Sequence, residues 1–556
     1  MRSTMQEVPL LISQVLEYGT TMYSKSEVVT WSAEGPRRSS YPDLGRDCRR
    51  LANALRALGI DGDQRIGTFM WNNEEHLELY LTVPSMGAVL HTINIRLFPQ
   101  QMIYVINHAD DKVIVVDNSL AEPFSKLLVH LPSVQHVIVN GPVPDAVRAA
   151  LGGDGTRQVH DYRTLLDAQP DQFSWPVFDE NDAAAMCYTS GTTGNPKGVV
   201  YSHRSNVLHS TYVAGNACMR LSEASRALAI VPLFHANAWG LPYAALISGA
   251  SLIMPDRFLQ AEPLVAMVEK ERVTAAGAVP TIWNDVLAYL DAHPEVDVSS
   301  IDNVMVGGSA CPPALMRGFQ ERHDITVFHG WGMTETSPVA SVAIPPGHAE
   351  GDEYWTYRYS QGRIAPHIEA RLVGADGTEQ PWDGASDGEI QVRGPWVTGS
   401  YYQEVDDGEK FQDGWLRTGD IGRLSSDGYL TLTDRAKDVI KSGGEWISSV
   451  DLENQLMGHP AVREASVIGV PDDRWGERPL AAIVVVQGET VTVDELRDYL
   501  GTLVARWQVP ERWAFVDEVP KTSVGKFDKK VIRARYAAGE LDVVQPGRPV
   551  DAPSTP

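Results

Sequence analysis

Residues 188–200, YTSGTTGNPKGVV, combine the groups that bind an anion. The segment holds four Ser or Thr hydroxyls, three glycines and a single lysine, Lys197. Glycine lets the backbone approach a ligand closely, and successive N–H groups beside hydroxyls form a concave surface of hydrogen-bond donors. The apolar residues 183–188 predict a buried strand, and 202–215 predict a helix with Ser202 as its N-cap. We therefore expect a phosphate-binding loop between a strand and a helix.

This loop does not follow the Walker pattern G-x-x-x-x-G-K-[ST], because Pro196 precedes Lys197 and Gly198 follows it. The segment GWGMTE at 330–335 does not follow the dinucleotide pattern G-x-G-x-x-G either. A P-loop ATPase or phosphotransferase is therefore disfavoured. The alternative is a surface loop without a ligand, and the strand and helix predicted around the segment weigh against it.

Composition excludes other classes of protein. The 556 residues carry 47 basic and 72 acidic side chains, a net charge of −25, whereas a nucleic-acid-binding protein should present a basic field. The cysteines at positions 48, 187, 218 and 311 form no Cys-x-x-Cys pair or Cys/His cluster, so we expect buried thiols rather than a metal or redox site. Residues 1–19 predict neither a signal peptide nor a membrane span, and the expected location is the cytoplasm.

The expected fold class is α/β, because short buried strands alternate with helical patterns along most of the chain. This pattern predicts a large N-terminal domain of layered sheets and helices with a largely parallel sheet. Residues 40–60 have helical apolar spacing that stops at Gly59. Predicted strands follow at 63–70, 110–117, 134–140, 226–233, 250–255 and 303–309.

Two further units are predicted toward the C-terminus. From about residue 360 to 434, alternating strands between Gly- and Asp-rich turns predict a small antiparallel or barrel-like subdomain. An α+β pattern follows, in which Ser448 and Thr492 begin helices with capping boxes. The Pro-rich residues 541–556 are expected to form a disordered tail.

Seven segments together resemble the adenylate-forming superfamily, which contains acyl-CoA synthetases, peptide-synthetase adenylation domains and beetle luciferases. The resemblance covers nearly the whole chain and keeps the family's order. It is strongest to medium- and long-chain fatty acyl-CoA ligases, and a subgroup acting on short acids such as methylthiopropionate looks similar. The segments are YTSGTTGNPKGVVYSH (188–203), PLFHANAWG (232–240), VGGSA (306–310), HGWGMTETSP (329–338), DGWLRTGDIG (413–422), DRAKDVIKSGGEWIS (434–448) and PKTSVGKFDKK (520–530).

The resemblance implies an AMP-forming ligase that works in two half-reactions. A carboxylate attacks the α-phosphate of ATP to give acyl-adenylate and pyrophosphate, and a thiol then attacks the acyl carbonyl and expels AMP. ATP, Mg²⁺ and CoA are implied, together with a small-molecule carboxylic acid, and a homodimer is the assembly by analogy. Because two anions must meet in the first step, positive charge must lie where they meet.

The resemblance assigns the first roles as follows. Lys526 would supply the mobile positive charge, whereas Lys529 and Lys530 in the same run are expected to be surface lysines. Thr334 would donate to the α-phosphate, and Glu335 would contact Mg²⁺, which needs only one carboxylate beside phosphate oxygens and water.

The nucleoside would be held by the following residues. Asp420 would accept both ribose hydroxyls, with Arg435 in support. Trp331 stands where the family commonly has tyrosine, and its flat ring is expected to stack on adenine. The predicted ATP site comprises Thr189, Ser190, Gly191, Thr192, Thr193, Gly194, Lys197, Gly308, Ser309, Ala310, Gly330, Trp331, Gly332, Met333, Thr334, Asp420, Arg435 and Lys526.

The resemblance also divides the chain into an adenylation domain at 1–434, a hinge at 435–437 and a mobile C-terminal domain at 438–540. Lys437 falls at the hinge, where rotation would withdraw Lys526 so that the thiol can enter. The implied CoA path comprises Lys441, Gly443, Gly444 and Trp446, and core packing is the equal alternative for Trp446.

His235 and Trp239 are expected to border the acid. They lie four residues apart, so on a helix they would share a face. The resemblance implies that His235 closes around the carboxylate without transferring a proton and that Trp239 walls or gates the tail channel. Gly308 and Gly332 complete the predicted acyl pocket. The sequence leaves open whether a short, Trp-blocked pocket or a long tunnel lies behind them.

Other functions remain as alternatives. A ligase for a short or aryl acid fits the same motifs, as does an acyl-AMP ligase that loads a carrier protein, although SGGEWIS at 442–448 favours free CoA. A luciferase-like oxygenase has no support beyond the shared motifs. A non-catalytic nucleotide or acyl binder belongs to a different class, and it would not need a mobile lysine.

Overall fold

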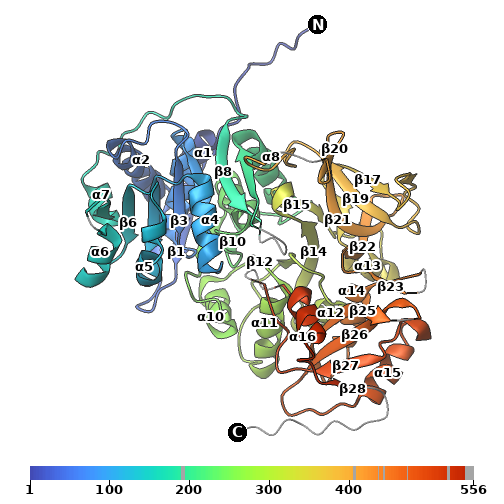
Figure 1. Cartoon of the computed structure of the whole chain (residues 1–556). Coiled ribbons are helices and arrows are strands. Elements are labelled where there is room, and N and C mark those ends of the chain that lie inside the picture. The colour runs from blue at the N-terminus through green and yellow to red at the C-terminus, as the bar shows by residue number, and fades with distance from the viewer. Residues whose placement is uncertain are drawn as a thin grey trace.

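The computed structural model describes residues 1–153, 155–189, 195–404, 408–435, 437–442, 445–472, 474–522 and 526–544, with the backbone alone at 445 and 446. Within these residues the strands form three sheets. In Figure 1 the blue and cyan N-terminal elements lie on one side, the green ones in the middle, and the orange and red C-terminal ones on the other side. The predicted α/β class is confirmed.

The first sheet and its helices comprise residues 41–202. They are α2 (Tyr41–Ala57), β3 (Arg65–Phe69), α3 (Glu74–Ser85), β4 (Val89–Thr92), α4 (Pro99–Ala109), β5 (Val113–Asp117), α5 (Asn118–Ser125), β6 (His136–Asn140), α6 (Asp145–Gly152), β7 (Gln158–Asp161), α7 (Tyr162–Asp167), β8 (Ala183–Tyr188) and β9 (Gly198–Ser202). The strand order is β7-β6-β5-β3-β4-β8-β9, and all neighbours are parallel except β8 and β9.

The antiparallel pair corrects the prediction for the phosphate loop. Because β9 pairs with β8, residues 189–197 connect the two strands of a hairpin rather than a strand and a helix. Helix α8 (His203–Ala214) begins only after β9, where the Ser202 side chain accepts a hydrogen bond from Ser205 N, as predicted for an N-cap. A short apolar run such as 199–201 does not distinguish a strand from a helix. The loop therefore has its own N–H groups and hydroxyls as donors, without a helix N-terminus.

The second sheet is the largest. Its elements are α1 (Ile12–Met22), β1 (Glu27–Thr30), β2 (Arg37–Ser40), β10 (Arg226–Leu228), η2 (Ala236–Gly240), α9 (Leu241–Ser248), β11 (Ser251–Met254), α10 (Ala261–Glu271), β12 (Ala275–Ala278), α11 (Pro280–Ala292), β13 (Asn303–Val306), α12 (Pro313–His323), β14 (Thr326–Gly332), η3 (Thr334–Thr336), β15 (Val339–Val342), α13 (Gly351–Tyr359), β16 (Gly362–Ile364), β17 (Glu369–Val373), β18 (Glu379–Gln380), β19 (Gly388–Arg393), β20 (Phe411–Gln412), β21 (Trp415–Leu424) and β22 (Tyr429–Arg435).

The pairing in this sheet changes direction at β14. The order is β18-β17-β19-β21-β22-β16-β15-β14-β13-β12-β10-β11-β1-β2, with β20 beside β21. Neighbours from β1 to β14 are parallel, and the pairs from β14–β15 to β17–β18 are antiparallel. The antiparallel strands predicted after residue 360 are therefore present, and they continue the parallel sheet across β14.

The third sheet contains β23 (Ile440–Ser442), β24 (Glu445–Ile447), β25 (Val462–Asp472), β26 (Gly476–Val485), β27 (Arg512–Phe515) and β28 (Val543–Val544), with helices α14 (Ser449–Leu456), α15 (Val493–Gly501) and α16 (Lys529–Ala537). Ser448 and Thr492 cap α14 and α15, and the predicted capping box is present at Thr492, whereas Ser448 only accepts the cap hydrogen bond from Asp451 N. Two residues of the predicted tail form β28 beside β27, and 545–556 lie outside the described residues.

The main core lies between the first two sheets. All twelve residues of α3 are buried, and α1, α2 and α9 pack on this helix. The largest apolar cluster joins these helices to strands of both sheets, so the two sheets are held in a fixed relation. In the described part of the chain, no helix has the length and apolar character that crossing a membrane requires.

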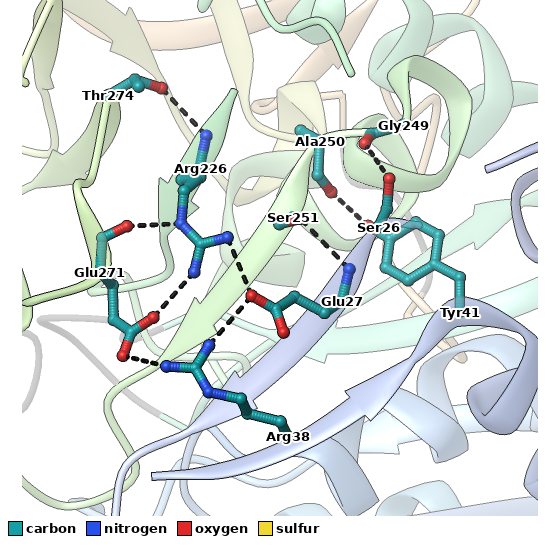
Figure 2. Close-up of polar contacts among 10 residues, drawn as sticks. All are labelled: Ser26, Glu27, Arg38, Tyr41, Arg226, Gly249, Ala250, Ser251, Glu271 and Thr274. Carbon is teal, nitrogen blue, oxygen red and sulfur yellow. Dashed lines mark hydrogen bonds and ion pairs between the residues drawn. The ribbon is translucent and has the colours of Figure 1, made fainter. Parts of the chain in front are cut away.

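Figure 2 shows a network of ion pairs near the β1–β2 edge of the second sheet. Glu271, which is 4% exposed at the end of α10, binds Arg38 of β2 at 2.6 Å and Arg226 of β10 at 2.8 Å. Glu27 of β1 contacts the same two arginines at 3.0 and 2.9 Å. The network therefore ties three strands and a helix together.

We expect Glu271→Ala to lower the free energy of unfolding by about 2–3 kcal/mol, because it leaves two arginines without their buried partner. The loss should be below that of a fully buried pair, since Arg38 is 45% exposed and both arginines keep Glu27. The control is Glu122→Ala, whose carboxylate faces Lys126 at 3.7 Å with both side chains largely exposed. That change should cost less than about 0.5 kcal/mol. Equal losses for the two variants in urea unfolding would contradict the role of the network.

Candidate active site

Two hydrogen bonds close the phosphate loop at its base. Thr189 N donates to the Lys197 carbonyl at 2.9 Å, and Lys197 N donates to Thr189 Oγ1 at 3.1 Å. The Lys197 ammonium pairs with Glu404 at 2.8 Å and lies 4.7 Å from the centre of the Tyr401 ring. Five of the predicted ATP-binding residues, at 190–194, lie outside the described residues, so their role stays a prediction.

The end of β14 and the short helix η3 carry the next group of predicted residues. A Cβ on Gly332 would lie 1.9 Å from the Pro338 carbonyl oxygen, so only glycine fits where this strand ends. The Thr334 carbonyl accepts from Tyr201 at 2.8 Å, and the Glu335 carboxylate accepts from the Tyr401 hydroxyl at 2.5 Å. These bonds fix a backbone turn and a carboxylate that is 5% exposed.

The Glu335 carboxylate fits the metal that the resemblance implies. Among the described residues, no group of three or more His, Cys, Asp or Glu side chains gathers to form a protein cage for a metal. Mg²⁺ does not require such a cage, because one or two carboxylates with substrate phosphates and water suffice. Glu335, oriented by Tyr401, is therefore suited to hold Mg²⁺ that arrives with ATP.

Asp420 lies between two donors. Its Oδ2 accepts from Trp331 Nε1 at 2.8 Å, and its Oδ1 faces Arg435 Nε at 3.1 Å. Asp420 and Arg435 are directly opposite across β21 and β22, and Trp331 comes from β14. The structure thus brings together three residues that are distant in the sequence and that were predicted around one nucleoside.

Lys526 reaches this group from the C-terminal part of the chain. A Cβ on Gly308 would lie 3.8 Å from Lys526 Cε, so the lysine lies against the loop after β13. The pKa of Lys526 is lowered to about 8, chiefly by burial and also by the positive charges of Arg435 and Lys437, whereas Asp420 and Glu335 oppose the shift. Ser309 is exposed and Ala310 half-buried in the same loop.

His235 lies near the same lysine. Burial lowers the pKa of His235 to about 3, with Lys526 and Arg96 adding to the decrease, so the imidazole is neutral at physiological pH. A neutral ring can still accept a proton, so the expectation that His235 transfers none stays a prediction.

The turn that follows His235 corrects the spacing argument for Trp239. Ala236, Asn237, Ala238 and Trp239 have φ values of +44°, +51°, +47° and +57°, so the turn is left-handed rather than α-helical. Non-glycine residues rarely adopt this conformation singly, and four in a row are exceptional. A right-handed helical face therefore does not relate His235 to Trp239.

The Trp239 ring packs on two glycines of neighbouring strands. Cβ atoms on Gly277 and Gly307 would lie 3.4 and 3.1 Å from ring carbons of Trp239. The tryptophan is 7% exposed, so its ring occupies the space above these strands.

The segment after β22 connects the site to the C-terminal part. Asp438 N and Val439 N donate to the Arg435 carbonyl at 2.8 and 2.9 Å, which forms a turn around Lys437. Burial lowers the pKa of Lys437. On the far side of this turn, Ser449 N and Oγ both donate to Asp434 Oδ2 at 2.6 Å.

One lysine of the final motif differs from expectation. Lys529, predicted to be a surface lysine, is 12% exposed and pairs with Glu453 at 2.9 Å while donating to Ser449 Oγ at 2.5 Å. Burial of Lys529 depends on a partner 76 positions earlier, which spacing within the motif does not reveal. Lys530 is exposed, as expected.

The predicted CoA path is described only in part. Lys441 is exposed, and its N–H donates to Glu477 at 2.8 Å. Trp446 pairs with Lys441 through the backbone of β23 and β24, and Gly443 and Gly444 lie outside the described residues. The roles of these residues stay predictions.

Sequence reasoning missed Tyr401 and Lys410. Lys410 Nζ donates to the Thr418 carbonyl at 3.3 Å, and burial lowers its pKa against the attraction of Glu335 and Asp420. Both residues come from the connection between β19 and β21, where no motif spacing marks them. Only the tertiary structure reveals them. The Tyr401 hydroxyl bonds Glu335, and the Lys410 ammonium interacts with the charges of Glu335 and Asp420.

Comparisons with known proteins identify the family of this chain. Residues 18–402 match the model of the AMP-binding enzyme family, and 451–526 match that of the AMP-binding enzyme C-terminal domain. The chain belongs to the AMP-binding enzyme family, which confirms the resemblance seen in its motifs.

Individual relatives cover almost the full chain. The 3-methylmercaptopropionyl-CoA ligase of Ruegeria lacuscaerulensis is 40% identical over 96% of this chain and 99% of its own. The long-chain-fatty-acid–CoA ligase of Thermus thermophilus is 41% identical over 96% and 97%. The crystal structure of the anthranilate CoA ligase AuaEII in complex with anthranoyl-AMP is similar with a TM-score of 0.86 and 25% identity, over 97% of this chain and 100% of that one.

We expect kcat/KM for ATP to fall as the pH rises through about 8, because Lys526 is a charged ammonium below its lowered pKa and neutral above it. The measurement is pyrophosphate release between about pH 6.5 and 9.5. The matched variant is Lys526→Arg, whose guanidinium stays charged, so the alkaline fall should disappear even if the rate is lower. An unchanged alkaline fall in Lys526→Arg would assign it to another group.

Proposed function

We propose that this protein is an ATP-dependent, AMP-forming ligase that joins a medium- or long-chain fatty acid to CoA through an acyl-adenylate. The observation that carries the proposal is Lys526, whose side chain extends from the C-terminal part of the chain to the loop at Gly308. There it interacts electrostatically with the buried Asp420 and Glu335 and with Arg435, whose side chain is 46% exposed. The family membership and the fatty-acid–CoA ligase among the relatives support the reaction class. We also propose a cytoplasmic location, where ATP and CoA are supplied.

In the first half-reaction a carboxylate oxygen of the acid forms a bond to the α-phosphorus of ATP, and the bond to pyrophosphate breaks. The Lys526 ammonium lies where the two anions would meet, and a compact ammonium suits this task because it contacts oxygens of both. Mg²⁺, held by Glu335, would neutralise phosphate charge. Asp420 and Arg435 would hold the ribose, and Thr334 would donate to the α-phosphate.

In the second half-reaction the thiol sulfur of CoA bonds to the acyl carbon, the thiol proton is lost, and the bond to AMP breaks. Lys526 occupies the site in this structure, so it must withdraw before a thiol can approach. Rotation at Lys437 would do this, and it would have to break the two hydrogen bonds from Ser449 to Asp434, which lie on opposite sides of the hinge.

A second candidate is a ligase for a short acid, and the position of Trp239 favours it. The indole is 7% exposed and packs on Gly277 and Gly307, so a long tail that passed this point would have to displace it. The 3-methylmercaptopropionyl-CoA ligase among the relatives supports a short substrate as well.

The test of the proposed function is AMP release with ATP, Mg²⁺ and CoA across acids from propionate and methylthiopropionate to palmitate, with cinnamates included. A CoA-dependent maximum among medium- or long-chain acids would support the fatty-acid ligase, and a maximum at short acids would support the second candidate. Pyrophosphate release without CoA dependence for every acid would favour a carrier-protein acceptor. Absence of pyrophosphate with all acids would favour a non-catalytic binder.

We expect Lys526→Ala to slow formation of the acyl-adenylate by about 10²–10³-fold, the effect of losing one preorganised electrostatic contact. Thioester formation from supplied acyl-adenylate should be nearly unchanged, because the lysine has left the site by then. Lys530→Ala, which removes an exposed lysine four residues later, is the control and should retain both rates. Equal losses in the two half-reactions of Lys526→Ala would contradict the assignment.

Trp239→Ala should show whether the indole is a fixed end of the predicted acyl pocket or a side chain that moves aside for the acyl tail. If the indole is a fixed wall, removing it should move the preferred acid to longer chains, with a gain of about 10-fold or more in kcat/KM for acids several carbons longer. If the indole moves aside for the tail, the preferred chain length should stay the same. The readout is kcat/KM across the same acid series for the variant and the parent.

A further inference from the structure

We propose that Trp331 is a positioning residue whose indole N–H sets the orientation of the Asp420 carboxylate that binds the ribose of ATP. This inference rests on the proposed function, because it deepens the role of Asp420. The predicted role of Trp331 was to stack on adenine with the face of its ring. The structure points instead to the edge of the ring.

Both partners of the hydrogen bond between Trp331 and Asp420 are buried. Trp331 is 6% exposed and Asp420 is 4% exposed, so the indole N–H and the carboxylate are both removed from water. A buried donor without a partner is costly, and a buried carboxylate needs donors even more. The 2.8 Å bond between Trp331 Nε1 and Asp420 Oδ2 satisfies both groups at once.

The Asp420 carboxylate has acceptor sites left over for a ligand. Two carboxylate oxygens offer about four lone-pair sites. Trp331 takes one on Oδ2 through its hydrogen bond, and Arg435 Nε forms an ion pair with Oδ1 at 3.1 Å. At least one site on each oxygen is therefore left by these two partners, which matches the two hydroxyl donors of a ribose.

The partners of Asp420 also set the direction in which its remaining acceptor sites point. A carboxylate held through one oxygen can turn about its bond to Cβ, whereas donors on both oxygens fix its plane. The donors come from different strands, Trp331 from β14 and Arg435 from β22, so the sheet itself fixes the plane. Loss of the indole N–H would leave the Arg435 contact in place and release only Oδ2.

The test is the preference of the enzyme for ribose over deoxyribose in Trp331→Phe. Phenylalanine keeps an apolar ring and removes the N–H. The measurement is pyrophosphate release with ATP, 2′-deoxyATP and 3′-deoxyATP. The two ratios compared are kcat/KM for ATP divided by kcat/KM for each deoxynucleotide. At least one of the two ratios should fall by about tenfold, the effect of one hydrogen bond to a charged group. These ratios do not depend on the folded fraction of a preparation, so partial misfolding does not imitate the result.

The matched control is Trp513→Phe. Trp513 is fully buried, and its indole N–H donates to the Pro510 carbonyl at 3.0 Å in the C-terminal part of the chain. This variant also loses a buried indole hydrogen bond, yet it should leave both nucleotide ratios unchanged. Equal falls of kcat/KM for all three nucleotides in Trp331→Phe would show a general packing or stacking role and overturn the proposal.

Asp420→Asn separates this inference from the proposed function. If Asp420→Asn leaves the nucleotide ratios unchanged, the ribose site is wrong and this inference falls with it, whereas the ligase reaction itself is tested separately by CoA-dependent AMP release. If Asp420→Asn removes the preference but Trp331→Phe keeps it, only the role of Trp331 is wrong. The proposal expects both single variants to weaken the preference and Trp331→Phe to add no further loss in the Asp420→Asn background.

Discussion

The site depends on the placement of the Lys526 ammonium inside a region that already holds the Arg435 guanidinium. Burial and the like charge both disfavour the charged lysine, and they lower its pKa to about 8. The carboxylates of Asp420 and Glu335 offset part of this cost. Two incoming anions, a carboxylate and a triphosphate, would offset the rest. A site that is electrostatically costly when empty is therefore prepared for ligands that bring negative charge.

The position of this site follows from the sheet. β14 is parallel to β13 and antiparallel to β15, so it is the strand at which the second sheet changes direction. The end of β14 carries Trp331 and leads directly into η3 with Glu335. In sheets with parallel strands, ligands bind beyond the carboxyl ends of the strands, where the connections diverge. The antiparallel strands then bring Asp420 and Arg435 back to the same end.

Features set by local interactions were predictable from the sequence. The caps at Ser202 and Thr492 need only the next three residues, and the buried strands are apolar along their length. The motifs also singled out Lys526 and Asp420, which interact electrostatically in the structure, and their roles stay predictions.

Features set by distant partners were not predictable. The apolar residues of β9 fit a strand or a helix equally, and only β8 decides between them. Lys529 is only 12% exposed because Glu453 and Ser449 face it. Tyr401 bonds Glu335, and Lys410 interacts with the charges of Glu335 and Asp420, from a connection without a motif. The sign of φ at 236–239 has no periodic signature in the sequence at all.

The left-handed turn at 236–239 limits how the predicted acid pocket could be altered by directed evolution. Valine and isoleucine would be natural choices at position 239 for an apolar pocket, yet β-branched residues tolerate a φ of +57° poorly. A library at this position would lose such members to backbone strain rather than to a poor fit with the acid. Glycine and asparagine tolerate the conformation best. Residues for a library at position 239 should therefore be chosen first for their tolerance of a positive φ, and only then for the size of their side chain.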